Sequence, residues 1–364
     1  MKNYYLTSES VTEGHPDKIC DKISDYILDE ALKQDKNSKM AVEATIKDDL
    51  ILIYGEATTN AKLNYEQLAK QVLKEIGYTE EYNVIVKVNK QSIEINNAVN
   101  KDKIMAGDQG IMFGYATNET KEYMPLTILL ANKLAKRLTD VRKQAKDSIL
   151  EPDGKTQVTI EYENDLPKRV DTIIIASQHK ENIDYEELKN LIIDEVIKPI
   201  IPKELLDENT KILINTSGKF TIGGSFGDSG TTGRKIVADT YGGIGKVGGG
   251  CFSSKDPSKV DRSGAYYARY VAKNIVAHNL ADKCEIELAY AIGKEHPISV
   301  YINTFNTNKV HIEKIYDYVN KNFNFSVDNI IKELDLLNPI YYNLAAYGHF
   351  GRTDLNLTWE QIKS

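Results

Sequence analysis

The stretch from Asn215 to Arg262 constrains the fold more than any other, because just over half of the chain's 23 glycines lie in it. Residues without a Cβ allow a backbone to turn tightly or to approach another group closely. The stretch also holds more Lys and Arg than Asp, although the whole chain has a net charge of −7. A flexible linker would consist of Gly and Ser alone. The local reversal of charge therefore indicates an anion site.

A polyphosphate with its metal ion would suit such a site, because Lys and Arg contact phosphoryl oxygens and Asp oxygens hold Mg²⁺. The alternative interpretation is a set of surface hairpin turns with solvated charges. Two nucleotide-binding motifs are excluded. Gly227 to Gly233 is one residue too long for a Walker A motif, and no long apolar helix follows the GxGxxG match at Gly243–Gly248.

Composition places the chain among ordinary proteins of two or three packed units, with 364 residues, 41% hydrophobic and 27% charged. A run of about 18 apolar residues is lacking, as is the apolar core of a signal peptide, so we expect a cytoplasmic protein without a membrane segment. The acidic balance argues against nucleic-acid binding. The cysteines Cys20, Cys251 and Cys284 form no CxxC pair, so we expect free thiols.

Apolar periodicity predicts a pattern of helix, strand, strand and helix that occurs three times, with a further strand in the first two rounds. Helices are expected from Pro16 and over 64–76, 124–146, 184–197, 262–281, 310–321 and 326–337, and strands over 40–46, 50–59, 84–88, 157–162, 170–178, 211–215, 284–293 and 297–305. The fold class is α+β: three similar units, each a mostly antiparallel sheet with helices on one face. We expect intertwined units at about 1–123, 124–215 and 216–364.

Residues near the N-terminus form a second candidate phosphate site. Pro16 suits a first helical turn, which places His15 at or beside the N-cap, where free amides and the helix dipole favour an anion. Asp17 would contact phosphate only through a cation, so it is a candidate metal ligand. The alternative is that Asp17 merely complements the dipole and His15 is a surface histidine.

Two further features remain ambiguous from the residues alone. Glu43 and Glu56 interrupt apolar strands, which is costly unless each carboxylate has a partner or a cation. The solvent-facing side of a half-buried strand explains them at a lower energetic cost, so the residues alone favour that interpretation slightly over a functional one. The segment from Lys90 to Gly114 shows no sustained period, and 91–107 is a candidate lid or a plain surface loop.

Five segments together resemble the signatures of the S-adenosylmethionine synthetase family. They are GHPDK (14–18), GDQGIMFGYATNET (107–120), GGSFGDSGTTGRK (223–235), DTYGG (239–243) and KDPSKVDRS (255–263). The resemblance extends from Ser8 to about Arg352. It implies a pseudo-threefold arrangement of the units, two-fold paired subunits with active sites at their interface, and often a homotetramer.

The resemblance also implies the reaction: ATP, L-methionine and water give S-adenosylmethionine, phosphate and diphosphate. The methionine sulfur attacks C5′ of ATP, and the displaced triphosphate is then hydrolysed. Mg²⁺, two ions per site, and K⁺ are the implied cofactors. A metal-dependent nucleotide phosphohydrolase or kinase, and a non-catalytic nucleotide sensor, remain the alternatives.

Site residues follow from the resemblance by position. The implied catalytic residues are His15 beside the leaving O5′ and the triphosphate-binding Lys155, Arg234, Lys235 and Lys255. Further ATP contacts are Asp108, Asp153, Lys219, Phe220, Asp228 and Cys251. Methionine contacts are Glu56, Gln91, Asp228, Lys259 and Ile292. Metal ligands are Asp17 and Asp261 for Mg²⁺ and Glu43 for K⁺. Two departures stand out: Glu151 occupies a position where a basic residue is usual, and Lys219 one where Arg is usual.

Overall fold

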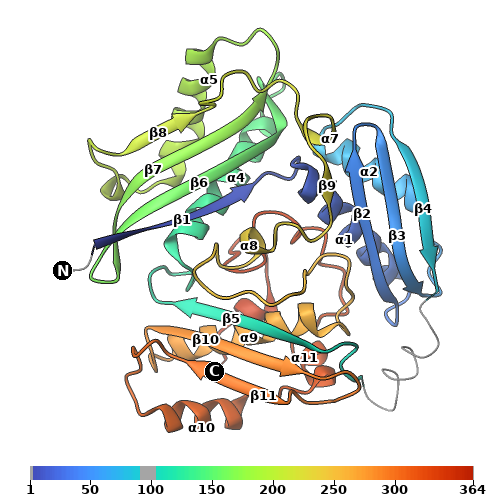
Figure 1. The fold of residues 1–364 in the computed structure, drawn as a ribbon, viewed down its shortest axis with the longest axis vertical. Coiled ribbons are helices and arrows are strands. Elements are labelled where there is room, and N and C mark those ends of the chain that lie inside the picture. The colour runs from blue at the N-terminus through green and yellow to red at the C-terminus, as the bar shows by residue number, and fades with distance from the viewer. Residues whose placement is uncertain (1–2, 91–103, 364) are drawn as a thin grey trace.

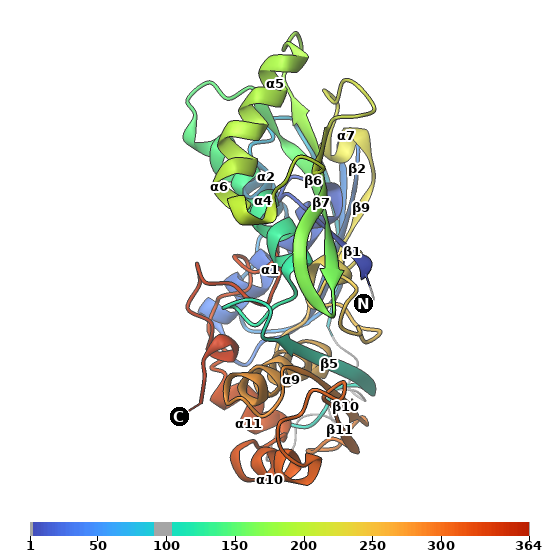
Figure 2. The ribbon, with the colours of Figure 1, turned by 90° about the vertical axis from the view of Figure 1, so that its left-hand side faces the viewer.

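Three β-sheets surround a common centre in the computed structural model, which describes residues 3–90 and 104–363 (Figure 1). Figure 2 shows the sheets as one layer and most helices as the other. The expected α+β class of three similar units is therefore confirmed. The long helices pack on one face of each sheet, and none of those within residues 3–90 and 104–363 covers the opposite face.

The first sheet has the strand order β4-β3-β2-β9, the second β1-β6-β7-β8 and the third β11-β10-β5. β3–β4 and β7–β8 pair in parallel, and every other pairing is antiparallel. The strands are β1 (Asn3–Val11), β2 (Lys39–Lys47), β3 (Leu50–Thr58), β4 (Asn83–Asn89), β5 (Gly110–Thr117), β6 (Leu150–Glu163), β7 (Leu166–His179), β8 (Lys211–Ile214), β9 (Gly230–Thr231), β10 (Lys283–Tyr290) and β11 (Ser299–Asn303).

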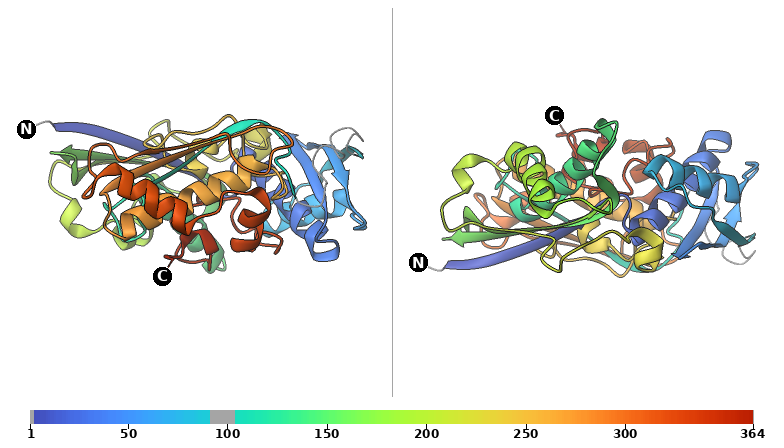
Figure 3. Two further views of the ribbon diagram at one scale, coloured as in Figure 1. Left: turned by 90° about the horizontal axis from the view of Figure 1, so that it is seen from below. Right: turned by 90° about the horizontal axis from the view of Figure 1, so that it is seen from above.

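Helices cover one face of each sheet, as the views from below and from above in Figure 3 also show. The first sheet carries α1 (Pro16–Gln34) and α2 (Tyr65–Ile76). The second carries α4 (Leu126–Gln144) and a continuous helix made of α5 (Tyr185–Leu191), the π-helical η1 (Ile192–Ile197) and α6 (Lys198–Ile200). The third carries α9 (Val260–Ala277), α10 (Ile312–Asn322) and α11 (Val327–Glu333). Short turns are α7 (Gly224–Gly227), η2 (Lys203–Leu205), α8 (Ile236–Asp239) and η3 (Thr358–Glu360).

Each sheet receives one edge strand from a neighbouring part of the chain. β1 precedes α1 but pairs with β6, β5 precedes α4 but pairs with β10, and β9 precedes α9 but pairs with β2. The sequence predicted none of these three strands. The segment 90–114, interpreted as irregular, ends in β5. The partner strands of β1, β5 and β9 belong to other units, so no local sequence pattern predicts the pairing. The proposed unit boundaries at 123 and 215 stay predictions.

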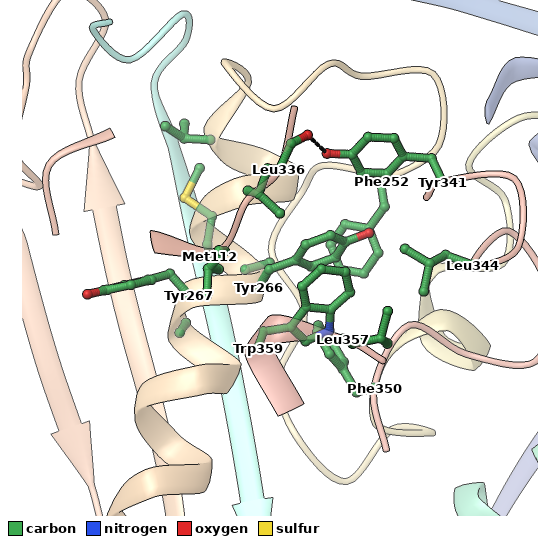
Figure 4. Close-up of a cluster of buried hydrophobic side chains, with 14 of the residues drawn as sticks. Met112, Phe252, Tyr266, Tyr267, Leu336, Tyr341, Leu344, Phe350, Leu357 and Trp359 are labelled. Atoms are coloured by element: carbon green, nitrogen blue, oxygen red, sulfur yellow. Dashed lines mark hydrogen bonds between the residues drawn. The ribbon is translucent and has the colours of Figure 1, made fainter. Parts of the chain in front are cut away.

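The C-terminal segment closes the core over α9. Trp359 is fully buried and stacks on Tyr266, with ring centroids 4.2 Å apart, and its indole N–H donates to the carbonyl of His349 at 3.0 Å. Figure 4 shows Phe252 and Phe350 in the same cluster. The cluster joins the end of the glycine-rich stretch, the helix α9 and the chain's last residues, so the start of α9 is held firmly.

Among residues 3–90 and 104–363, no helix combines the length and the apolar character that crossing a membrane would need.

Candidate active site

The N-terminus of α1 has the geometry that the sequence predicted. His15 is the N-cap, Pro16 is the first helical residue, and Nδ1 of His15 accepts from the backbone N–H of Asp17 at 3.2 Å. Because Nδ1 accepts, the ring proton of the neutral imidazole lies on Nε2. Burial, with Lys235 nearby, lowers the pKa of His15 to about 4. His15 is therefore a neutral hydrogen-bond donor at neutral pH.

Asp17 is buried and gathers cations from the glycine-rich stretch. Its Oδ2 lies 2.5 Å from Nζ of Lys235, and its Oδ1 lies 3.7 Å from Nε of Arg234. Oδ1 also accepts from the backbone N–H of Thr231 at 2.9 Å. Burial by itself would raise the pKa of Asp17, but the hydrogen bonds from Lys235 and Thr231 lower it. Asp17 thus does more than complement the helix dipole.

The glycine-rich stretch crosses the centre of the molecule between the three sheets and includes β9 (Figure 1). It is not a series of surface hairpins. At Gly230 a Cβ would lie 2.1 Å from the carbonyl oxygen of Pro16. Only glycine allows the strand to lie so close to the start of α1.

Three further predicted residues are Asp153, Lys155 and Phe220. Asp153 and Lys155 lie near the beginning of β6, where it pairs with the end of β1, and Phe220 lies beside the end of β7. Oδ2 of Asp153 accepts from the N–H of Gly224 at 2.9 Å, and burial raises the pKa of Asp153 to about 6 although that hydrogen bond opposes it. Lys155 is half exposed, with its Nζ 3.8 Å from Glu9, and lies near enough to lower the pKa of His15. Phe220 exchanges hydrogen bonds with His179.

We name these residues the α1 group. Its members are His15, Asp17, Asp153, Lys155, Lys219, Phe220, Asp228, Arg234 and Lys235. Asp228 acts on the pKa of His15, so it lies close to the helix start. Lys219 and Arg234 are exposed. Several cations therefore surround the start of α1 with their amino or guanidinium groups open to a ligand.

A second set of predicted residues gathers at the start of α9. Nζ of Lys255 lies 2.7 Å from Oδ2 of Asp261, and Lys259 pairs with Asp256. A Cβ at Gly250 would lie 2.2 Å from the carboxyl carbon of Asp261, and one at Gly110 would lie 3.3 Å from its Oδ1. The loop that carries Asp108 therefore approaches Asp261.

The remaining members of this second set lie on the open face of the first sheet and in adjoining loops. Ala41 of β2 pairs with Glu56 of β3 and forms a bridge with Lys255, so Glu56 and Lys255 flank one residue. Glu43 accepts from the hydroxyl of Tyr54 at 3.1 Å.

Ile292 belongs to this set through its neighbour Gly293, whose N–H donates to the carbonyl of Ala106 at 2.9 Å. Cys251 is a free thiol, as predicted for Cys20 and Cys284 too. Gln91 and most of the candidate lid at 91–107 lie outside the described residues. We name the α9 group: Glu43, Glu56, Asp108, Cys251, Lys255, Lys259, Asp261 and Ile292.

Metal ligands are sparse in both groups. Across residues 3–90 and 104–363, no three His, Cys, Asp or Glu side chains converge to hold an ion. Mg²⁺ in nucleotide sites is usually bound by one or two carboxylates together with phosphate oxygens and water. Asp17 and Asp261 each offer a carboxylate beside a lysine. The donor set therefore fits Mg²⁺ that arrives with a polyphosphate.

Sequence reasoning missed Asp21, Asp25 and Arg262, which are fully buried beside the groups. Asp25 Oδ1 lies 2.6 Å from a guanidinium nitrogen of Arg262. Aspartates recur every four residues from Asp17 to Asp29, which places them on one face of α1. This four-residue spacing was the sequence feature that could have predicted the buried aspartates.

Lysine and arginine side chains on a glycine-rich stretch, beside buried carboxylates, suit an enzyme that acts on a nucleotide polyphosphate. Sequence profiles agree in detail: those of the N-terminal, central and C-terminal domains of S-adenosylmethionine synthetase match residues 3–103, 103–220 and 222–361. The S-adenosylmethionine synthase of Finegoldia magna (strain ATCC 29328 / DSM 20472 / WAL 2508) is 51% identical over 381 residues, covering 99% of this chain and 97% of the relative. The chain belongs to the S-adenosylmethionine synthetase family.

Proposed function

We propose that this chain is a methionine adenosyltransferase that makes S-adenosylmethionine from ATP, L-methionine and water through the α1 and α9 groups. The observation that carries the assignment of the site is the convergence of Lys235, Arg234 and Asp17 beside His15. Lys235 and Arg234 would supply fixed positive charge to the leaving triphosphate.

The reaction needs no nucleophile from the protein, because the methionine sulfur is the nucleophile. The protein has to orient the two substrates and to stabilise the charge of the leaving group. A lone pair of the methionine sulfur forms the S–C5′ bond, and the C5′–O5′ bond breaks with its electrons passing to the triphosphate. Water then cleaves the triphosphate to phosphate and diphosphate. Cations fixed beforehand stabilise the charge that develops on the leaving group. Nε2–H of His15, kept neutral, can donate to the leaving O5′.

Asp17 and Asp261 would hold Mg²⁺, and Glu43 would hold K⁺. Bound Mg²⁺ would neutralise phosphoryl charge. Lys155, Arg234, Lys235 and Lys255 would bind the triphosphate, with Lys219, Asp153 and Cys251 in further ATP contacts. Phe220 and Asp108 would contact the nucleoside. Glu56, Gln91, Asp228, Lys259 and Ile292 would bind methionine.

A second copy of the chain would complete the site. Lys235 pairs with Asp17 and Lys255 pairs with Asp261, but among the described residues no ion pair joins Lys235 to Asp261 or Lys255 to Asp17. The open sheet faces and adjoining loops expose Tyr5, Ile85, Ile111, Ile222, Ile298 and Tyr301, which are large apolar side chains. Apolar area of this kind favours association. We infer a two-fold dimer in which the α1 group of one copy faces the α9 group of the other.

The homotetramer and the cytoplasmic location stay predictions from the resemblance and the sequence, as does the absence of a nucleic-acid or membrane partner.

Purified protein supplied with ATP, methionine, Mg²⁺ and K⁺ tests the reaction. We expect a sulfonium product together with equal amounts of phosphate and diphosphate, and no phosphate release when methionine is omitted. Release of phosphate without methionine would instead support a nucleotide phosphohydrolase.

Mixed dimers test the shared site. Lys235→Met and Lys255→Met should each be nearly inactive alone. In a dimer of one Lys235→Met and one Lys255→Met chain, one of the two sites keeps both lysines. Unfolding and refolding the mixture should therefore restore about a quarter of the wild-type activity, because about half of the dimers are mixed and each has one intact site. No recovery would contradict a site built from two copies.

A further inference from the structure

Four aspartates occupy one buried face of α1. Asp17, Asp21, Asp25 and Asp29 have relative exposures of 1%, 0%, 0% and 5%. Charged side chains are rarely buried unless they are paired. Asp25 and Asp29 each hold a separate segment of the chain. Asp17 and Asp21 hold one segment together, the one that carries Arg234 and Lys235.

Asp17 and Asp21 act together as a substitute for a neighbouring strand. Oδ1 of Asp17 accepts from the N–H of Thr231 at 2.9 Å, and Oδ1 of Asp21 accepts from that of Gly233 at 2.8 Å. The intervening N–H of Thr232 points the other way and donates to Ala44 of β2 at 3.0 Å. The segment therefore has hydrogen bonds on both edges.

The spacing of the two elements explains why this pairing works. Four residues of an α-helix advance by about 6 Å. Two residues of a β-strand advance by about 6.7 Å. Carboxylates four positions apart on α1 therefore match alternate amides along β9 and its continuation.

Asp21 also connects this segment, through Lys18, to Asp239, which follows Lys235 by four residues. Nζ of Lys18 lies 3.0 Å from Oδ2 of Asp21 and also pairs with Asp239, the last residue of α8. The carbonyl oxygen of Asp239 accepts from the N–H of His349 at 2.9 Å. The buried Lys18–Asp21–Asp239 network thus fixes Gly233 and Asp239, and Arg234 and Lys235 lie between them.

We propose that Asp21 is a positioning residue for this reaction, because it fixes the backbone from which Arg234 and Lys235 reach the triphosphate. Asp21 is fully buried, so it acts through the N–H of Gly233 and through Lys18. The inference rests on the proposed role of Arg234 and Lys235.

Paired double variants isolate the Gly233 hydrogen bond. Lys18→Met with Asp21→Asn keeps a side-chain oxygen that can accept from Gly233. Lys18→Met with Asp21→Leu has nearly the same shape but no acceptor. Asp239 loses Lys18 in both, so that effect cancels. The readout is calorimetric binding of a non-hydrolysable imido analogue of tripolyphosphate with Mg²⁺, calculated per folded protein.

We expect the Leu double variant to bind the analogue at least about tenfold more weakly than the Asn double variant, since small misplacements of binding groups are costly. The KM for methionine should be the same in both. Equal affinity for the analogue in the two variants would overturn the inference. A parallel rise in the methionine KM would also overturn it, because that pattern is general loosening. If the Leu variant does not fold, Asp21→Ser, which is too short to reach Gly233, replaces it.

Two controls separate the possible failures. Asp29→Asn removes a buried carboxylate from the same face of α1, but Asp29 holds the N–H groups of Tyr341 and Tyr342, outside both groups. It should leave affinity for the analogue unchanged. Lys235→Met tests the underlying function: if it binds the analogue as the wild type does, the proposed triphosphate site is wrong. If it loses affinity while the two doubles remain equal, only the role of Asp21 is wrong.

Discussion

Nζ of Lys235 lies 2.5 Å from Oδ2 of Asp17, although the two residues are 218 positions apart in the chain. The pair joins the glycine-rich stretch to the start of α1 and brings the two candidate phosphate sites of the sequence into one place. Lys235 is partly exposed, so its ammonium group remains open to a ligand on one side.

Lys235→Met should lower kcat about 10²- to 10³-fold, by analogy with the loss of a fixed electrostatic donor. The KM for methionine should change little, because the lysine contacts the triphosphate. Steady-state formation of S-adenosylmethionine measures both. Lys332→Met is the matched control, since Lys332 also lies 2.5 Å from an aspartate, Asp328, but on α11. Full activity of Lys235→Met would refute the assignment.

Gly230→Ala should abolish activity and lower Tm, because the new Cβ would lie 2.1 Å from the carbonyl oxygen of Pro16 and 2.8 Å from the N atom of Asp17. β9 would have to move away from α1. Gly249→Ala is the control, since nothing lies within 4 Å of a Cβ there. Thermal unfolding and turnover should both separate the two variants. Similar behaviour of the two would mean that the close approach at Gly230 is unimportant.

Arg262→Met should cost about 3–5 kcal/mol of unfolding free energy, because it leaves the carboxylate of Asp25 buried without its cation. Both side chains have zero exposure, and Arg262 also donates to the carbonyl of Phe252 at 2.6 Å. Adding Asp25→Asn should recover part of this loss. Denaturation in urea measures the three variants. A single variant as stable as the wild type would show that the pair does not stabilise the fold.

Asp29 should make stability depend on pH in a defined direction. Burial raises its pKa to about 7, although the N–H groups of Tyr342 and Tyr341 oppose the rise. The unfolded pKa is about 3.9, so the folded state binds the proton more tightly. The contribution of Asp29 to stability is therefore greatest at low pH and is lost as pH rises from about 4 to about 7.

Asp29→Asn cannot titrate, so the stability of the wild type relative to this variant should fall over that pH range by up to about 4 kcal/mol. Urea denaturation at pH 4 and at pH 8 provides the measurement. Other buried aspartates titrate in both proteins and cancel in the difference. A constant difference between the two proteins would show that Asp29 has an ordinary pKa.

Local patterns in the sequence predicted local structure well. His15 is the N-cap of α1, α2 ends at Ile76, and Gly77 follows in the left-handed conformation with φ of 118°. The long helix over 124–146 is present as α4 at Leu126–Gln144. In each case the signal and the structure involve the same few residues.

Residues whose partners are distant in sequence were harder to predict. β9 has only two residues, and β1 carries polar side chains along much of its length. Both are strands because another unit offers them an edge. In the sequence, Asp21 is indistinguishable from any other charged residue on a helix. Only the structure shows that it contacts Gly233 and Lys18.

The sequence by itself determined the helices and inner strands, the three-part organisation and the family. Periodicity, helix caps and long motifs each depend only on residues that are close together in the chain. Tertiary structure alone decided which strand completes each sheet, that the four aspartates of α1 hold distant segments of the chain, and that the site residues divide into the α1 and α9 groups. The physical reason is that burial and hydrogen bonding depend on which distant segments pack together, and a buried carboxylate is stable only once those segments supply its partners.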